Sequence, residues 1–89
     1  MKEVLIVEPT YPLLAKSARI QGSVDVLVKV DEKGVPSMVT ASNGSTILQR
    51  AAEAAAAEWR FRPATRDGKA VPANFDIRFK FKLHPDQIS

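Results

Sequence analysis

The stretch that decides the fold is residues 23–42, which read SVDVLVKVDEKGVPSMVTAS. Valine occupies every second position from Val24 to Val30, and such alternation of β-branched residues predicts a strand over residues 23–31 with one buried face. The residues DEKG then form a turn that ends in glycine, which tolerates a positive φ. Residues 35–42 make a second strand. Because so short a turn leaves no room for a crossover, the two strands form an antiparallel hairpin.

Two helices are predicted on either side of this hairpin. The polar residues 42–46 are suited to cap a helix, and apolar residues recur beyond them at helical spacing as far as Trp59, before Pro63 prevents continuation. A shorter helix precedes the hairpin, since Pro12 is suited to its first turn and Gly22 to its end. The apolar side of this shorter helix is predicted to consist of Leu13, Leu14, Ala15, Ala18 and Ile20.

A third strand is predicted near the C-terminus, over residues 74–83, after a polar loop at 65–69. Apolar side chains again alternate with polar ones along this strand. They are Phe75, Ile77, Phe79, Phe81 and Leu83. The chain is therefore interpreted as one small domain over residues 1–89, with an extended lead-in over residues 1–11, an ordered core over residues 9–83 and a loose tail over residues 84–89.

This order of elements, α-β-β-α-β, predicts an α+β fold in which two helices pack on one face of a three-stranded antiparallel sheet. With residues 23–31 as the central strand, a right-handed crossover through the long helix places residues 74–83 on the edge opposite residues 35–42. The third strand is then long, free of proline along its length, and unpaired on one side.

Length and composition exclude most catalytic and metal-binding functions. In 89 residues, a deep active-site cavity would take up the only core available. No cysteine is present, and the single histidine, His84, lies near the end of the chain. Thiolate, zinc-finger and histidine-cluster sites are thus excluded, and no enzyme activity, cofactor or metal is expected. The early apolar run from Val4 to Val7 is too short to span a membrane.

The net charge of +3 is mild, so no nucleic-acid partner is expected. The alternative is a small RNA-binding module, because Phe75, Phe79 and Phe81 resemble the aromatic rows that stack bases. That function requires exposed rings, whereas a sheet covered by helices buries them. Trp59 and Phe61 are interpreted as core residues. The basic residues Arg60, Arg62, Arg66 and Lys69 are interpreted as a solvated surface.

A series of short motifs, in order, resembles the C-terminal domain of TonB, the energy-transducing protein of Gram-negative envelopes. The resemblance extends from Pro9 to Leu83, and its most specific element is WRFRP at residues 59–63, after an alanine-rich helix. The other motifs are Tyr11-Pro12, Gly22, the alternating Val24, Val26 and Val28, Asp31-x-x-Gly34, Ser42-x-Gly44, and Leu48 with Ala51-Ala52. The chain departs from the family pattern in GKAVP at residues 68–72 and in Glu8, where relatives have glutamine.

The resemblance implies a periplasmic domain at the end of a longer chain, with an inner-membrane helix and a proline-rich spacer upstream. Domains of this family bind the TonB box, a short extended segment at the N-terminus of outer-membrane transporters. Energy from an ExbB/ExbD-type proton-driven motor then reaches the transporter and drives active uptake, for example of iron siderophores. The resemblance therefore implies a peptide-binding, force-transmitting domain rather than an enzyme.

The predicted binding site is the open edge of the third strand, where a partner peptide adds a strand and satisfies the unpaired N–H and C=O groups. The predicted partner-binding residues are Pro9, Tyr11, Asn74, Phe75, Asp76, Ile77, Arg78, Phe79, Lys80, Phe81 and Lys82. Of these, Pro9 and Tyr11 rest on the resemblance alone. The charged side chains on the polar face sum to +2, which favours an acidic segment. An open edge also suits pairing with a second copy, so a homodimer is an alternative association.

Overall fold

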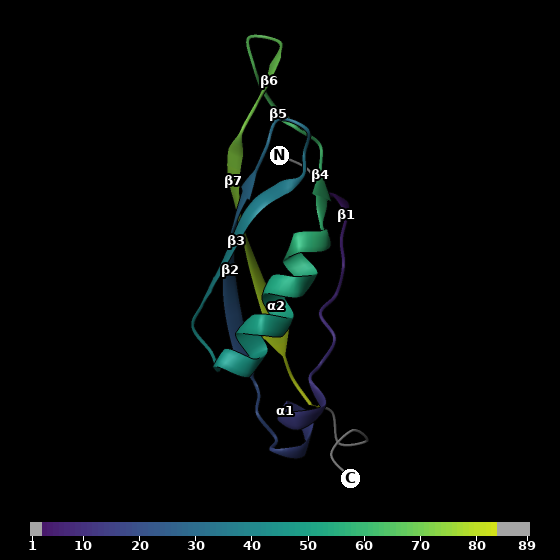
Figure 1. Ribbon diagram of the computed structural model, residues 1–89, viewed down its shortest axis with the longest axis vertical. Coiled ribbons are helices and arrows are strands. Elements are labelled where there is room, and N and C mark those ends of the chain that lie inside the picture. The colour runs from purple at the N-terminus through teal and green to yellow at the C-terminus, as the bar shows by residue number, and fades with distance from the viewer. Residues whose placement is uncertain (1–2, 84–89) are drawn as a thin grey trace.

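The computed structural model describes residues 3–83, and its long strands run along the longest of its three dimensions, 54 × 21 × 14 Å (Figure 1). The two helices and three long strands follow the expected order, α-β-β-α-β, and four short strands are added to them. The elements are β1 (Glu3–Leu5), α1 (Leu13–Ser17), β2 (Gly22–Val30), β3 (Pro36–Ser42), α2 (Thr46–Glu58), β4 (Arg60–Phe61), β5 (Ala64–Arg66), β6 (Lys69–Val71) and β7 (Ala73–Phe81).

The three long strands form one antiparallel sheet in the order β3-β2-β7. The central strand, β2, faces β7 along its whole length, from Gly22 opposite Phe81 to Val30 opposite Ala73. The α+β class, the antiparallel sheet and the placement of the third predicted strand on the edge opposite β3 are therefore confirmed. The alternation of valines predicted this sheet because only one face of β2 is buried.

One face of the sheet is covered by α2, which crosses it in Figure 1. Ser45 caps the first turn of α2, its hydroxyl accepting from the backbone N–H of Leu48 at 3.4 Å. The alanines of α2 bring its backbone close to the sheet, and no buried polar or charged residue interrupts the core within residues 4–83. That core consists of Ala15, Val24, Val26, Val28, Val30, Leu48, Ala52, Ala55, Ala56, Trp59, Phe61, Ile77, Phe79 and Phe81.

The first helix differs from its prediction in length and in the side it buries. α1 ends at Ser17, where Arg19 adopts a φ of 57° and the N–H of Ile20 donates to the carbonyl of Ala15 at 2.8 Å. This is a Schellman closure with arginine at the left-handed position that glycine usually occupies. Gly22 instead begins β2. Of the apolar side predicted for α1, Ala15 is buried, whereas Leu13 and Leu14 are exposed. The helix lies at one end of the sheet (Figure 1).

Two short ladders were not predicted from the sequence. β1 pairs antiparallel with β4, and β5 pairs antiparallel with β6. The β5–β6 hairpin replaces the expected polar loop at 65–69, and its two turn residues, Asp67 and Gly68, have φ values of 52° and 79°. Two consecutive positive φ values define the type I′ turn, which Asp-Gly favours between strands. The basic residues Arg60, Arg62, Arg66 and Lys69 are all exposed, as predicted.

The predicted loose tail, residues 84–89, and His84 with it, lie outside the described residues. Among residues 3–83, no group of histidines and acidic residues is placed to hold a metal ion. No helix in that part of the chain combines the length and hydropathy needed to cross a membrane.

Candidate functional site

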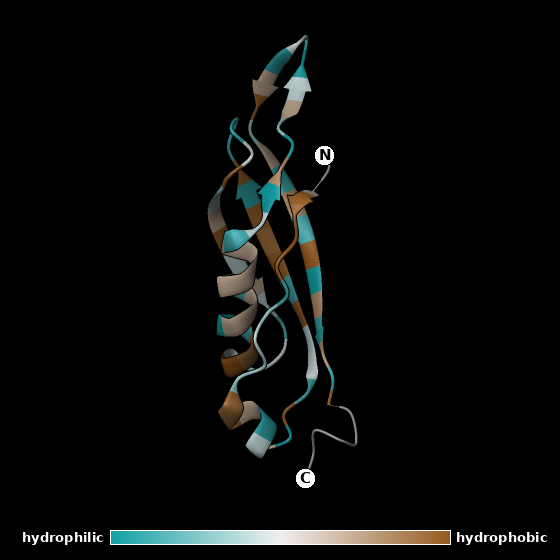
Figure 2. Cartoon of the chain, turned by 90° about the vertical axis from the view of Figure 1, so that its right-hand side faces the viewer, coloured by the Kyte–Doolittle hydropathy of each residue, from teal (hydrophilic) through white to brown (hydrophobic). Residues whose placement is uncertain are grey.

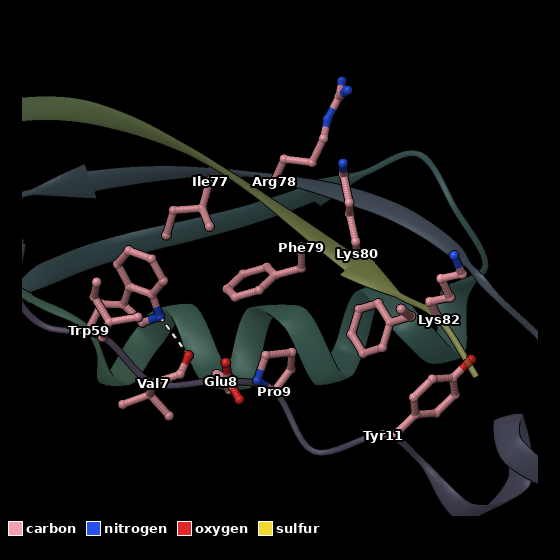
Figure 3. A pocket seen from close by; sticks show the side chains of 12 residues that line it. Val7, Glu8, Pro9, Tyr11, Trp59, Ile77, Arg78, Phe79, Lys80 and Lys82 are labelled. Carbon is pink, nitrogen blue, oxygen red and sulfur yellow. Dashed lines mark hydrogen bonds between the residues drawn. The ribbon is translucent and has the colours of Figure 1, made fainter. Parts of the chain in front are cut away.

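A groove of about 370 Å³ runs between the lead-in segment, Ile6 to Tyr11, and the outer edge of β7 (Figure 3). Trp59, at the end of α2, closes it from one side. The groove is lined by Ile6, Val7, Glu8, Pro9, Tyr11, Trp59, Ile77, Arg78, Phe79, Lys80, Phe81 and Lys82. It therefore brings together a free strand edge and an extended segment of the same chain.

The lead-in is held in place by side chains of the core. The indole N–H of Trp59 donates to the carbonyl oxygen of Val7 at 2.8 Å, a contact drawn in Figure 3. Further along, the Tyr11 hydroxyl donates to the carbonyl oxygen of Ile20, and the Tyr11 ring meets Phe81 edge-on at 5.4 Å between centroids. Partial burial raises the pKa of Tyr11 above its usual range, so the hydroxyl keeps the proton that it donates. The lead-in wall of the groove is thus fixed at both ends.

The floor of the groove is apolar. Ile77 and Phe79 point from β7 toward the lead-in in Figure 3, and Phe79 meets Trp59 edge-on at 5.9 Å between centroids. Figure 2 shows the same alternation along β7 as bands of apolar and polar residues. Because Phe79 and Phe81 are only 7% and 4% exposed and Phe75 is half-buried, these rings are not available to stack bases. Their burial argues against the RNA-binding alternative.

The direction of the backbone N–H and C=O groups of β7 can be deduced from one contact at the opposite edge of the sheet, in β3. The N–H of Ala41 in β3 donates to Oε2 of Glu53 in α2 at 3.0 Å, so it points away from β2. Ala41 faces Val26, and residues of an antiparallel pair alternate between exchanging two backbone hydrogen bonds and exchanging none. Val26 therefore directs its backbone groups to β7, where it faces Ile77.

The same alternation fixes the remaining residues of β7. Since Ile77 bonds to β2, the residues two positions away on either side also bond to β2, and the residues between them direct their N–H and C=O groups outward. The outward-directed residues are Asn74, Asp76, Arg78 and Lys80. Within residues 3–83 no strand pairs with this second edge. The lead-in faces the edge across the groove without closing it.

One ion pair lies on the polar face of the sheet beside this edge. Arg78 donates from Nε to Oδ1 of Asp25 at 2.7 Å, and Asn43 donates to Oδ2 of the same carboxylate at 2.6 Å. The hydrogen bonds from Arg78 and Asn43 hold the pKa of Asp25 below its usual range, and the bond to Asp25 raises the pKa of Arg78. Arg78 is thereby paired with Asp25 within the domain, and the sum of charges along the strand did not reveal this pairing.

The profile described as "Gram-negative bacterial TonB protein C-terminal" matches residues 7–83. The chain belongs to the TonB C-terminal domain family. Members of this family are binding domains rather than enzymes, which confirms the non-enzymatic interpretation. The match begins at Val7, the residue that Trp59 binds, and so includes all of the groove lining except Ile6.

Relatives in the TonB family agree over the same range. Protein TonB of Vibrio cholerae is 32% identical over 79 residues, which are 86% of this chain and 32% of that protein. Protein TonB of Xanthomonas campestris is 37% identical over 78 residues, which are 85% of this chain and 35% of that protein. The chain thus spans about a third of the length of these relatives.

A solved TonB domain shares the fold. The solution NMR structure of the Pseudomonas aeruginosa TonB CTD superimposes with a TM-score of 0.73 at 30% identity. The superposition covers 92% of this chain and 85% of that one. The three-stranded sheet with its covering helix is therefore the fold of this family.

The groove unites most of the residues predicted for partner binding in this TonB domain. Pro9 and Tyr11 line it from the lead-in, and residues 77–82 line it from β7. Asn74, Phe75 and Asp76 lie outside it, further along the strand. Phe75 packs on Phe61 at 5.0 Å between ring centroids.

Sequence reasoning missed part of the groove lining in this TonB domain. The missed residues are Ile6, Val7, Glu8 and Trp59. Trp59 is a core residue as predicted, but it also binds the lead-in through its indole N–H. The family motif at residues 59–63 was the available signal, since a buried indole N–H needs an acceptor.

Trp59→Phe is expected to release the lead-in selectively, because phenylalanine keeps an aromatic ring but cannot donate to Val7. One lost hydrogen bond of about 1 kcal/mol corresponds to roughly five-fold faster amide exchange around Val7. Hydrogen exchange by NMR measures this directly. The matched control is Phe75→Leu, which trims the same aromatic cluster at a residue that does not line the groove. Equal acceleration around Val7 in both variants contradicts the assignment.

Asp25→Asn is expected to remove a small, pH-dependent contribution to folding stability. The Asp25 pKa is lower in the folded than in the unfolded chain, so its contribution is complete above the unfolded value of about 3.9 and is lost as the pH falls below it. The stability gap between wild type and variant therefore stays constant from about pH 5 to 7 and closes toward pH 3. Urea unfolding at each pH measures the gap. Asp76→Asn, without an ionic partner in residues 3–83, is the control, and a gap that widens in acid contradicts the linkage.

Proposed function

We propose that this chain is the partner-binding domain of a TonB-type energy transducer, and that it binds a short extended segment of an outer-membrane transporter by strand addition at β7. The observation that carries the proposal is the outward row of backbone groups on Asn74, Asp76, Arg78 and Lys80, which has no partner strand in residues 3–83. Two of these residues, Arg78 and Lys80, line the groove. Strand addition is the recognition mode that satisfies such a row.

The groove suits a segment that binds and is released repeatedly. A strand paired along these residues would form roughly four to six backbone hydrogen bonds, each contributing about 0.5–1.5 kcal/mol net. These bonds sum to about 2–9 kcal/mol before the cost of association, so backbone pairing alone gives weak binding and the apolar contacts in the groove supply the rest of the affinity. Apolar side chains on alternate residues of the guest would contact Phe79 and Phe81 on one side and Pro9 and Tyr11 on the other.

Family membership supports the wider setting of this proposal. The guest segment is the TonB box of an outer-membrane transporter, the domain works in the periplasm, and energy reaches it from an ExbB/ExbD-type motor. In the full-length protein, an upstream helix anchors it to the inner membrane. The chain's coverage of about a third of its relatives' length agrees with further segments of that kind.

The test is an NMR titration of the isotope-labelled domain with peptides from the N-termini of candidate transporters. Chemical-shift changes are expected from Asn74 to Leu83 and around Tyr11, whereas β3, on the opposite edge, stays unchanged. Light scattering during the titration separates peptide binding from homodimer formation at the same edge, since a dimer that uses β7 dissociates as peptide is added. Shifts confined to β3 or to the β5–β6 hairpin would refute strand addition at β7.

A further inference from the structure

The polar face of β7 does not carry a uniform positive charge. Of its two central cations, Arg78 is already engaged by Asp25, with Nε–Oδ1 at 2.7 Å and Nη2–Oδ2 at 3.4 Å. Lys80 lies two residues further along the same face, opposite the uncharged Ser23. Within residues 3–83, Lys80 has no acidic partner. A guest strand therefore meets one arginine that is already paired with Asp25 and one lysine that has no acidic partner in residues 3–83.

The charge changes sign on the other side of Arg78. Asp76 is exposed, faces Leu27 across the sheet, and has no basic partner within residues 3–83. Asp76 and Lys80 are four steps apart along the strand, a separation of about 13 Å. This exceeds the Debye length of about 8 Å at physiological ionic strength, so a guest residue senses the nearer of the two charges. The edge is thus polar along its length, negative at Asp76 and positive at Lys80.

These charged side chains lie close enough to a paired guest strand to interact with its side chains. Asp76, Arg78 and Lys80 are also the residues whose backbone groups point to the free edge. A residue paired with any of them places its side chain on the same face of the extended sheet, with Cβ atoms about 4.5–5.5 Å apart. Opposite charges at that separation attract and like charges repel.

The groove side of the guest meets different chemistry. The floor of the groove is formed by apolar side chains, and the charged group on the lead-in wall is the carboxylate of Glu8. An acidic guest side chain is therefore disfavoured in the groove and favoured on the polar face. Since successive residues of a strand point to opposite faces, the guest must alternate in character.

We propose that Lys80 and Asp76 together set the register of the bound segment. The segment alternates apolar residues, which enter the groove, with polar residues, and it places a carboxylate opposite Lys80 and none opposite Asp76. This inference rests on the strand addition proposed above and adds a selection rule to it.

The experiment uses three acetylated and amidated nine-residue peptides with apolar residues at alternate positions. They differ at a single polar position, which carries glutamate, glutamine or lysine. Affinities are measured at low salt for the wild-type domain, for Lys80→Glu and for Lys29→Glu. Lys29 is the matched control, because it is exposed on the same face but belongs to the central strand β2. Both substitutions change the net charge equally.

For the wild type, the glutamate peptide is expected to bind about two- to five-fold more tightly than the glutamine peptide. In Lys80→Glu the order reverses and the lysine peptide binds most tightly, whereas Lys29→Glu keeps the wild-type order. A nitroxide at the peptide N-terminus reports the register: moving the glutamate by two positions is expected to shift the broadened β7 signals by two residues.

Two results would overturn the proposal in distinguishable ways. If Lys80→Glu and Lys29→Glu change the affinities equally, or the broadened signals stay in place, strand addition stands and the selection rule fails. If none of the peptides perturbs β7 in the wild type, and transporter peptides do not either, strand addition fails and the selection rule with it.

Discussion

Lys80→Pro is expected to abolish peptide binding at β7 while leaving the domain folded. The Lys80 N–H points to the free edge, so proline at this position removes no hydrogen bond to β2. Proline is tolerated at edge positions of this kind for the same reason. For a guest strand, however, proline removes a donor and places a ring in the path of approach. A loss of at least ten-fold in affinity, by calorimetry or NMR titration, is the expected result.

The control is Lys80→Ala, which removes the same charge but keeps the backbone N–H. Its affinity is expected to fall only by the few-fold that an exposed charge pair contributes. The difference between the two variants isolates the backbone contribution. If both variants bind equally well, the guest does not hydrogen-bond to this edge. Thermal unfolding of both variants without peptide verifies that the fold is kept.

Gly34→Ala is expected to destabilise the domain strongly. A Cβ at Gly34 would lie 1.9 Å from the carbonyl oxygen of Phe61, and φ there is +82°. The Gly34 carbonyl also accepts from the Phe61 N–H at 2.9 Å, so this turn packs directly on β4. Relief of the clash requires the two backbones to separate. The cost is the left-handed strain of about 1–2 kcal/mol plus the displaced packing, about 3 kcal/mol or more in total.

Gly68→Ala is the matched comparison for Gly34→Ala. Gly68 has a φ of +79°, and a Cβ added there would meet no atom within 4 Å, so only the conformational strain applies. The two costs differ by about 1–2 kcal/mol or more, and each kcal/mol corresponds to about 4–8 °C of melting temperature in a domain of this size, so Gly34→Ala should melt at least about 4 °C below Gly68→Ala. Similar melting temperatures for the two variants would contradict the close contact with Phe61.

The sheet and α2 could be predicted from sequence because each buries one face only. The valines from Val24 to Val30 and the apolar residues of β7 repeat every second position, since the opposite face meets water. Leu48, Ala52 and Ala55 repeat at helical spacing for the same reason. Wherever a single periodicity controlled burial, the pattern located the element to within about two residues.

The elements that could not be predicted from the sequence do not depend on a repeating pattern of buried residues. α1 ended early because Arg19 takes the left-handed position, for which arginine gives no signal. The β5–β6 hairpin did carry a signal, Asp67-Gly68, but its flanking residues are mostly polar and resemble a loop. The β1–β4 ladder joins segments more than fifty residues apart, and no short-range pattern predicts such pairing.

The candidate site was predictable as an edge but not as a groove. Alternation in β7 placed its polar and apolar faces, and the order of elements placed the strand at the margin of the sheet. Which backbone groups point outward followed only from the contact between Ala41 and Glu53, two residues on different elements. The ion pair between Arg78 and Asp25 likewise depends on the register of β2 against β7.

The lengthwise course of β7 along the 54 Å axis has a mechanical consequence. A guest strand paired with β7 and pulled along that axis would be loaded in shear. Its backbone hydrogen bonds would then be strained together rather than opened one after another. The nine-residue ladder between β7 and β2 shares the same orientation and would carry the tension into the body of the sheet. A weakly bound segment in this geometry would resist a force along the strand axis. Without that force, it would dissociate as its hydrogen bonds open one after another from one end.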